Sequence, residues 1–250
     1  MTKKIASAVF LALSLAAFPA FAMDTDDPGT VAPKNVEVEI SGEYAKSAEG
    51  GETGLSIAAT TGILQNLDFG LTLPYTITDP DAGGGESGIG DLEAGLKFRF
   101  LEGEGARPAL ALTAGASIPT GDEDKGLGSG EVDLSAALVA GFEFKPVNLY
   151  VNLGYGRLTS ADTDAGEKAD IFSASAAVEW AVTEPFAVNA EFLYESAGAD
   201  GDDAPLAVTA GAAYTFSDMI ALDGGVRIGL SDAAPDWGLF ATLTVSLGGE

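Results

Sequence analysis

The chain has 250 residues, a formal net charge of −26, no cysteine and no histidine. Without cysteine no disulfide can hold the fold, and so large a negative charge excludes nucleic acid as a partner, because binding to phosphates requires cationic side chains. Two explanations of the acidity stay open: a salt-rich habitat, or a function that uses the negative charge.

The first residues have the features of a secretory signal peptide. A basic start at Lys3 and Lys4 precedes an apolar run from Ile5 to Leu15, and Ala20-Phe21-Ala22 fits the pattern recognised for cleavage. We predict a signal peptide at 1–22. The alternative, a permanent transmembrane helix, requires a longer uninterrupted apolar run.

The next stretch, residues 23–34, is acidic, contains Pro28 and Pro33, and shows no hydropathy period. We expect it to form a flexible acidic periplasmic leader. The folded domain is then expected at 35–250.

Strict alternation of apolar and polar side chains marks the region from Leu92 to Phe100, and it resumes from Pro108 to Ile118 after a short turn. A period of two is the signature of a strand with two unlike faces. One face here is almost entirely apolar, and the other carries charges, glycines and hydroxyls. This is the pattern of a transmembrane barrel strand, with lipid outside and a polar lumen inside. About ten residues is also the length that crosses a bilayer at a tilt.

The same pattern recurs along the chain and predicts about twelve strands, an even number typical of single-chain bacterial barrels. The expected strands are 36–44, 54–62, 67–77, 92–100, 108–118, 132–144, 148–158, 170–182, 186–196, 206–216, 220–230 and 237–247. The alternation is least regular in 54–62, because Ala-Ala-Thr-Thr interrupts it. The predicted fold class is therefore all-β, a transmembrane antiparallel up-and-down β-barrel.

The connections between these strands alternate in length. Tight turns at 64–66, 145–147, 183–185 and 217–219 alternate with Gly- and Asp-rich loops at 79–87, 120–131, 159–169 and 197–204. In bacterial barrels short turns face the periplasm and long loops face the exterior. Aromatic residues gather near the strand ends, as the two membrane interfaces favour. A soluble β-sandwich, the alternative, would place them in the middle of strands.

Several short motifs lie in a characteristic order: Gly88-Ile89-Gly90-Asp91-Leu92, Ile118-Pro119-Thr120-Gly121-Asp122, Gly126-Leu127-Gly128-Ser129-Gly130 and Asn152-Leu153-Gly154-Tyr155. Together they resemble the outer-membrane transporter family named for the meta-pathway of phenol degradation. The resemblance spans most of the chain after the signal peptide. It implies a barrel that lets small compounds, often aromatic or hydrophobic, cross the outer membrane.

Strand parity predicts the charged residues that line the lumen. They are Glu37, Glu39, Glu43, Glu93, Lys97, Arg99, Asp133, Glu143, Glu179, Glu191, Glu195, Asp223 and Arg227. One interpretation is a cation-favouring pore, since rings of charge set selectivity. The other is a salt-bridged network that fills a narrow barrel. Because a lone buried cation is costly, we expect each base to contact Glu93, Glu143, Glu179 or Asp223.

The sequence offers little that could support catalysis. Barrel hydrolases and acyltransferases that use histidine as general base are excluded, because the chain has no histidine. Glu191 and Glu195 share a strand face but lie about 13 Å apart along the strand, too far for a paired-carboxylate glycosidase. The acidic stretches 162–167 and 200–203 do not fit the spacing of calcium loops. We therefore predict no catalytic, cofactor or metal site.

These patterns together predict a passive channel or transporter for small solutes in the outer membrane of a Gram-negative bacterium. The alternative is a structural or adhesive barrel with a plugged, salt-bridged lumen. The expected partners are outer-membrane lipid, a small-molecule solute and, during biogenesis, the barrel-assembly machinery.

Overall fold

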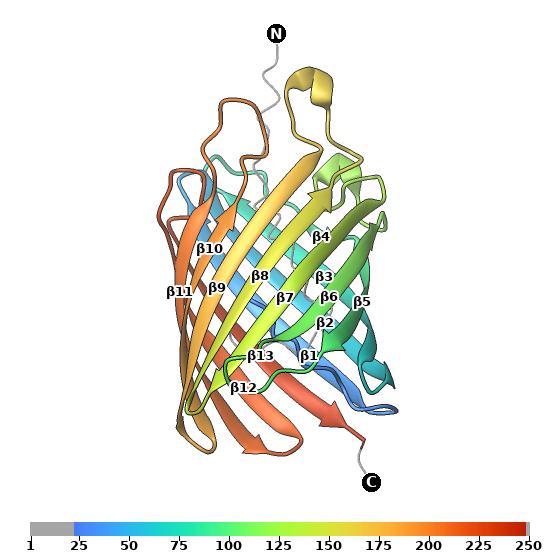
Figure 1. Ribbon diagram of the computed structural model, residues 1–250. Coiled ribbons are helices and arrows are strands. Elements are labelled where there is room, and N and C mark those ends of the chain that lie inside the picture. Colours follow the sequence, from blue (N-terminus) through green and yellow to red (C-terminus); the bar gives the residue numbers. More distant parts are fainter. Residues whose placement is uncertain (1–22, 249–250) are drawn as a thin grey trace.

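The computed structural model describes residues 23–248 and shows one closed antiparallel barrel (Figure 1). The predicted signal peptide lies outside the described residues. The strands are β1 Val36–Ser47, β2 Gly50–Leu64, β3 Leu67–Pro80, β4 Ser87–Ile89, β5 Leu92–Leu101, β6 Ala109–Ile118, β7 Asp133–Phe144, β8 Val147–Arg157, β9 Asp170–Thr183, β10 Phe186–Glu195, β11 Leu206–Ser217, β12 Ile220–Gly229 and β13 Trp237–Leu247. Two short 3₁₀ turns, η1 Glu123–Lys125 and η2 Thr163–Ala165, lie in loops.

The barrel wall has twelve strand positions. β1 pairs antiparallel with both β2 and β13, so the sheet closes on itself and leaves no open edge. β4 and β5 pair with successive parts of β3, and the two pieces together occupy one position in the wall. The predicted twelve-stranded antiparallel barrel is confirmed, and the extra strand β4 arises where the predicted loop 79–87 ends in extended backbone.

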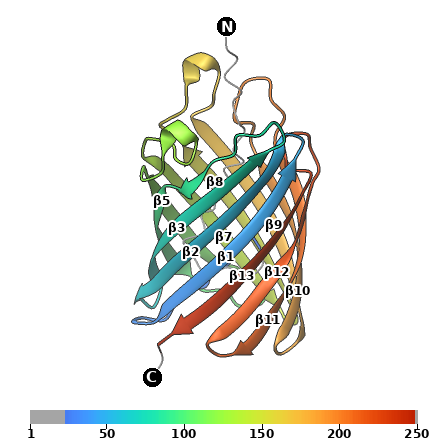
Figure 2. The same ribbon diagram turned by 180° about the vertical axis from the view of Figure 1, so that it is seen from behind.

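The two ends of the barrel differ, as Figures 1 and 2 show. Tight turns join β2 to β3, β7 to β8, β9 to β10 and β11 to β12 at the end where β13 finishes, which we call the turn end. Most of the longer connections, including those with η1 and η2, lie at the opposite end, which we call the loop end. The exceptions are the tight β1–β2 turn at the loop end and the longer β5–β6 connection, residues 102–108, at the turn end. The alternation of connection lengths seen in the sequence therefore corresponds to two distinct rims.

Side chains alternate between a lipid-type outer face and a polar inner face. On β8 the exposed fractions of Leu149, Val151 and Leu153 are 38%, 39% and 56%. On neighbouring β9, Trp180 is 51% exposed whereas Glu179, one residue away, is 7% exposed. Large exposed apolar side chains on regular strands are the outer band expected of a barrel in lipid. Among residues 23–248 there is no helix long and apolar enough to span a membrane.

Aromatic side chains form paired contacts near both rims. Tyr44 lies against Trp237 at the loop end, with ring centroids 5.4 Å apart. At the turn end Tyr214 lies against Phe216 with centroids 4.9 Å apart. Tilted ring pairs of this kind contribute about 0.5–1.5 kcal/mol beyond the area that they bury. Their positions agree with the two girdles that the sequence suggests.

Candidate functional site

The first described residues lie inside the barrel. We call residues 23–34 the N-terminal segment; it crosses the lumen before β1 begins and contacts strands on several sides of the wall. This corrects the expectation of a flexible periplasmic leader. The sequence indicated only that the segment is acidic and lacks a period. It did not indicate that the basic and polar groups inside the barrel would hold the segment there.

Two strands of the wall hold the beginning of the N-terminal segment. The Asp24 carboxylate forms an ion pair with the Arg227 guanidinium on β12. The backbone N–H groups of Asp24 and Thr25 and the Thr25 hydroxyl all donate to the Glu191 carboxylate on β10. Thr25 and Glu191 are only 2% and 4% exposed. Glu191 therefore accepts several hydrogen bonds from the segment at once. These bonds offset the cost of burying its carboxylate.

The middle of the segment is held by Lys97 on β5. Its Nζ lies 2.7 Å from Asp26 Oδ1 and donates to the Asp27 carbonyl at 2.9 Å. The Lys97 side chain is fully buried, and that of Asp26 is 15% exposed. With its amide oriented so that the oxygen faces the Asp26 N–H, Asn152 on β8 also donates to the Asp26 carbonyl at 3.0 Å. Asp26 is thus bound through its side chain and both backbone groups.

The end of the segment is held near the turn end. The Val31 N–H donates to Asp68 Oδ2 on β3 at 2.9 Å, and the Thr30 hydroxyl donates to the Gln65 carbonyl at 3.0 Å. Pro28 packs against Gly141, where an added Cβ would lie 2.7 Å from Pro28 Cδ. Only glycine leaves room for so close an approach.

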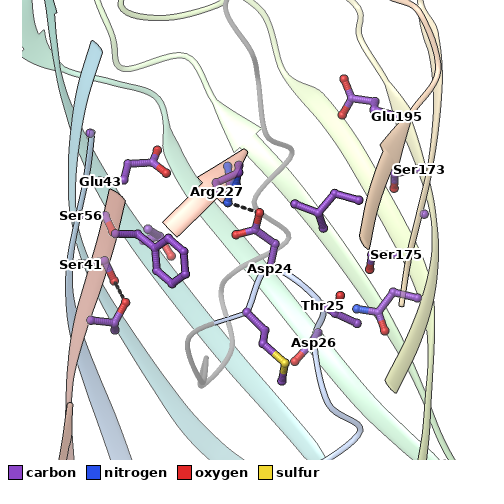
Figure 3. Close-up of a pocket in the computed structure, with 18 of the residues that line it drawn as sticks. Asp24, Thr25, Asp26, Ser41, Glu43, Ser56, Ser173, Ser175, Glu195 and Arg227 are labelled. Carbon is purple, nitrogen blue, oxygen red and sulfur yellow. Dashed lines mark hydrogen bonds and ion pairs between the residues drawn. The ribbon is translucent and has the colours of Figure 1, made fainter. Parts of the chain in front are cut away.

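The N-terminal segment separates two cavities. The cavity toward the loop end, which we call the upper cavity, has a volume of about 320 Å³ and is lined by residues 23–27 and by wall residues from most strands. The lower cavity, about 380 Å³, is lined by residues 27–29 and the turn-end wall. Figure 3 shows Asp24, Thr25 and Asp26 between two walls, with Ser41, Glu43 and Ser56 on one side and Ser173, Ser175 and Glu195 on the other.

The upper cavity is strongly acidic. Its described lining includes the carboxylates Asp24, Asp26, Asp27, Glu39, Glu43, Glu52, Glu93 and Glu195, with Arg227 as the base among them. The lower cavity is mixed in charge, since Arg99 and Arg107 accompany Asp27, Glu102 and Glu143. A solute in the upper cavity would therefore meet a field that favours positive charge.

The predicted lumen residues occupy three kinds of place. Glu39, Glu43, Glu93, Glu195 and Arg227 line the upper cavity, whereas Arg99 and Glu143 line the lower one. Lys97 and Glu191 hold the N-terminal segment. The remaining four residues interact with or lie within the wall. Glu37 accepts from Ser246, Asp133 from the Thr159 N–H and Glu179 from Asn148, while Asp223 is 4% exposed.

The ion pairs described for the three bases differ from those we expected. Lys97 pairs with Asp26, Arg227 pairs with Asp24, and Arg99 pairs with Glu102 at 3.5 Å. The ion pairs of Arg227 and Arg99 do not involve the acids that we expected, because the expectation considered only the strands. Two of the three acids belong to the N-terminal segment, which strand parity cannot place. The bases themselves do point inward, as parity predicts.

The sequence interpretation missed several residues that belong to the lumen. Asp68 follows the same alternation as the other inward residues of β3 and could have been found by parity alone. Glu52 lies before the predicted start of its strand, because β2 begins at Gly50 rather than at Gly54. Asp24 and Asp26 have no periodic signal at all. Their positions depend on long-range contacts that only the fold shows.

Three of the four sequence motifs, those at 88–92, 118–122 and 126–130, meet at one point of the loop end. The Asp91 carboxylate accepts hydrogen bonds from the N–H groups of Thr120, Gly121 and Ser129 and from the Ser129 hydroxyl. The Thr120 hydroxyl donates to the Gly90 carbonyl and accepts from the Leu92 N–H. These bonds satisfy backbone groups at the break between β4 and β5. We call this arrangement the Asp91 clasp.

The clasp folds the loop 119–132 against the wall. Leu127 is 8% exposed, and its Cδ1 would lie 2.8 Å from a Cβ at Gly88. Gly88 pairs with Thr76, which lines the upper cavity. Leu127 therefore covers the inner side of the wall at the loop end. Within residues 23–248 no group of three or more Asp or Glu residues is arranged to hold a metal ion.

The sequence profile of the family described as "Putative MetA-pathway of phenol degradation" matches residues 22–247. No curated protein matches the chain. Among solved structures, the chain is similar to the COG4313 outer membrane channel from Pseudomonas putida F1, with 15% identity, a TM-score of 0.69, and coverage of 90% of this chain and 100% of that one.

Two porins have the same architecture. The NanC porin shares 9% identity, with a TM-score of 0.60 and coverage of 84% of this chain and 99% of that one. The KdgM porin shares 8% identity, with a TM-score of 0.53 and coverage of 86% and 99%. At these identities the likeness establishes the fold.

Proposed function

The chain belongs to the MetA-pathway family of phenol degradation, and from this premise we propose that it is a channel for passive passage of small solutes across the outer membrane of a Gram-negative bacterium. The observation that carries the proposal is the closed barrel with an apolar outer face and a polar lumen that contains two cavities. The family name supports aromatic or hydrophobic compounds as the solute class. The similarity to outer-membrane channels and porins supports the location.

The lumen charge supports a preference for cations. Eight carboxylates of the described lining, Asp24, Asp26, Asp27, Glu39, Glu43, Glu52, Glu93 and Glu195, surround the upper cavity. Fixed negative charge in a narrow pore attracts cations and repels anions. We infer that small cations and uncharged solutes pass in preference to anions.

Purified protein in planar bilayers tests this function. We expect discrete conductance steps and a reversal potential that indicates cation preference in a salt gradient. Glu43→Gln with Glu195→Gln should reduce that preference, because both carboxylates line the upper cavity. Glu184→Gln is the matched control, since Glu184 is exposed in the tight turn between β9 and β10.

The alternative is a structural or adhesive barrel whose lumen stays plugged. The position of the N-terminal segment favours it, because the segment stands between the two cavities. Silence in bilayers across many insertions, with a folded barrel shown by heat-modifiable migration on a gel, would support the plug and contradict the channel.

The remaining parts of the proposal concern partners and chemistry. We infer that lipid contacts the apolar band and that the barrel-assembly machinery inserts the chain. No residue is assigned a catalytic role, because the chain has no histidine, and Glu191 binds the N-terminal segment whereas Glu195 lines the upper cavity.

A further inference from the structure

The wall holds the N-terminal segment by specific ion pairs and hydrogen bonds, as in peptide recognition, and not only by filling the lumen with packed atoms. Two cations bind side chains, since Arg227 pairs with Asp24 and Lys97 with Asp26. Glu191 and Asp68 accept backbone N–H groups of the segment. Charge-assisted hydrogen bonds of this kind are about twice as strong as neutral ones and depend on geometry.

We propose that the inner wall of the barrel is a binding site for a short acidic peptide, that residues 24–31 are its resident occupant, and that solute passage opens when this occupant leaves. The proposal rests on the channel function proposed above and names what regulates it. None of the wall residues that hold the occupant is a carboxylate of the upper-cavity lining; they are Lys97, Arg227, Glu191, Asp68 and Asn152.

The site reaches across the lumen. Lys97 lies on β5 and Arg227 on β12, and the strands β3, β2, β1 and β13 separate them in the sheet. Glu191 on β10 and Asn152 on β8 bind from further directions. A peptide that satisfies all of these groups must lie across the pore, which explains why residues 23–29 line both cavities.

The occupant can leave without breaking the barrel. The paired registers of the wall begin at Val36, so the barrel's strand pairing does not include residues 24–31. The segment is tethered next to β1 by Pro33, which bridges to Gly62, and by the Lys34 N–H, which donates to the Gly62 carbonyl. Its release costs the side-chain contacts described above and leaves every strand ladder intact.

The charges in the lumen make Lys97 and Arg227 necessary for holding the segment. The segment carries Asp24, Asp26 and Asp27 into a lumen that is already acidic. Like charges repel there, and the attraction to Lys97 and Arg227 must offset this repulsion. Replacing these bases by uncharged side chains of similar size should therefore release the segment and leave the wall folded.

The first experiment replaces residues 24–31 by glycine and serine at equal length and measures single-channel conductance. We expect a severalfold larger conductance than that of the wild type, with heat-modifiable migration unchanged. Lys97→Met with Arg227→Met should give the same direction of change. Conductance equal to that of the wild type in both variants would overturn the inference and leave the channel function standing. A folded variant that is silent would instead contradict the channel function itself.

The second experiment adds the peptide in trans. A synthetic peptide with the sequence of residues 23–31 should block the replaced variant in a concentration-dependent way. A control peptide with asparagine in place of Asp26 should need at least about tenfold more for half block, since a charge-assisted bond is worth about 1.5–3 kcal/mol and 1.4 kcal/mol is a factor of ten. Lys97→Met in the replaced background should weaken the block similarly. Equal block by both peptides, or none by either, would contradict a recognition site.

Discussion

The barrel wall and the N-terminal segment are held in different ways. The wall consists of strands in continuous register, so that each strand shares most of its backbone bonds with two neighbours. The segment has no such ladder and depends on side chains far away in sequence, such as Lys97 and Arg227. The wall should therefore be insensitive to single lumen substitutions, whereas the segment should respond to them. The difference separates a scaffold from a movable part.

The largest effect should come from a charge placed on the outer face. Leu153 lies near the middle of β8 and is 56% exposed to the surroundings of the barrel. Leu153→Lys should destabilise the folded barrel in lipid by about 2–4 kcal/mol, the cost of a cation near the bilayer midplane. Chemical unfolding in lipid vesicles measures the change. Leu153→Ala is the control, and an equal loss in both variants would argue against lipid on this face.

The next largest effect should come from the Asp91 clasp. Asp91→Ala removes the acceptor of four hydrogen bonds and should free the loop 119–132, at a cost of about 1–3 kcal/mol for the donors left unpaired. Limited proteolysis should then cut this loop sooner than in the wild type. Asp122→Ala is the matched control, because Asp122 and its partner Lys125 are both about half exposed. Unchanged proteolysis of Asp91→Ala would show that the clasp does not hold the loop.

A smaller effect, confined to the segment, should follow Lys97→Met. The fully buried Lys97 is replaced without loss of volume, and Asp26 is left unpaired. We expect loss of hydrogen-exchange protection at Thr25 and Val31 with the strands unchanged, because removing one partner of a buried pair leaves an uncompensated charge. Adding Asp26→Asn should restore part of the protection. Strand amides that also lose protection would contradict the separation of wall and segment.

The smallest effect should come from an ion pair on the rim. Arg157 and Asp170 lie 2.9 Å apart on β8 and β9, with about half of each side chain exposed. Exposed pairs contribute little to stability and are screened by salt. Arg157→Gln should leave the unfolding midpoint unchanged within error. A clear shift would mean that rim charges stabilise the wall more than their exposure suggests.

The same contrast explains what the sequence could predict. Alternation places Leu153 outside and Glu179 inside because the side-chain period of a strand is two, and a slip by one residue would expose every polar group to lipid. Even the irregular strand β2 fits, since Ile57 is 56% and Thr60 2% exposed.

No comparable rule applies to the N-terminal segment. Asp26 and Lys97 are separated by 71 positions in the sequence. They come together only when the barrel has closed around the N-terminal segment. The acids of the N-terminal segment that pair with Lys97 and Arg227 were therefore not predicted, although the inward direction of these two bases was. The Asp91 clasp was visible as a set of motifs, but the sequence did not show that one carboxylate joins them.

The most direct test of the barrel uses two neighbouring residues of β2. The chain has no cysteine, so Ser56→Cys and Ile57→Cys each allow a single spin label. Ser56 lines the upper cavity, and Ile57 is 56% exposed on the outer face. In lipid vesicles the label at 57 should collide mainly with oxygen, which concentrates in lipid, and the label at 56 mainly with a water-soluble nickel complex. Similar accessibilities at the two positions, or the reverse order, would contradict a wall with lipid on one side and a polar lumen on the other.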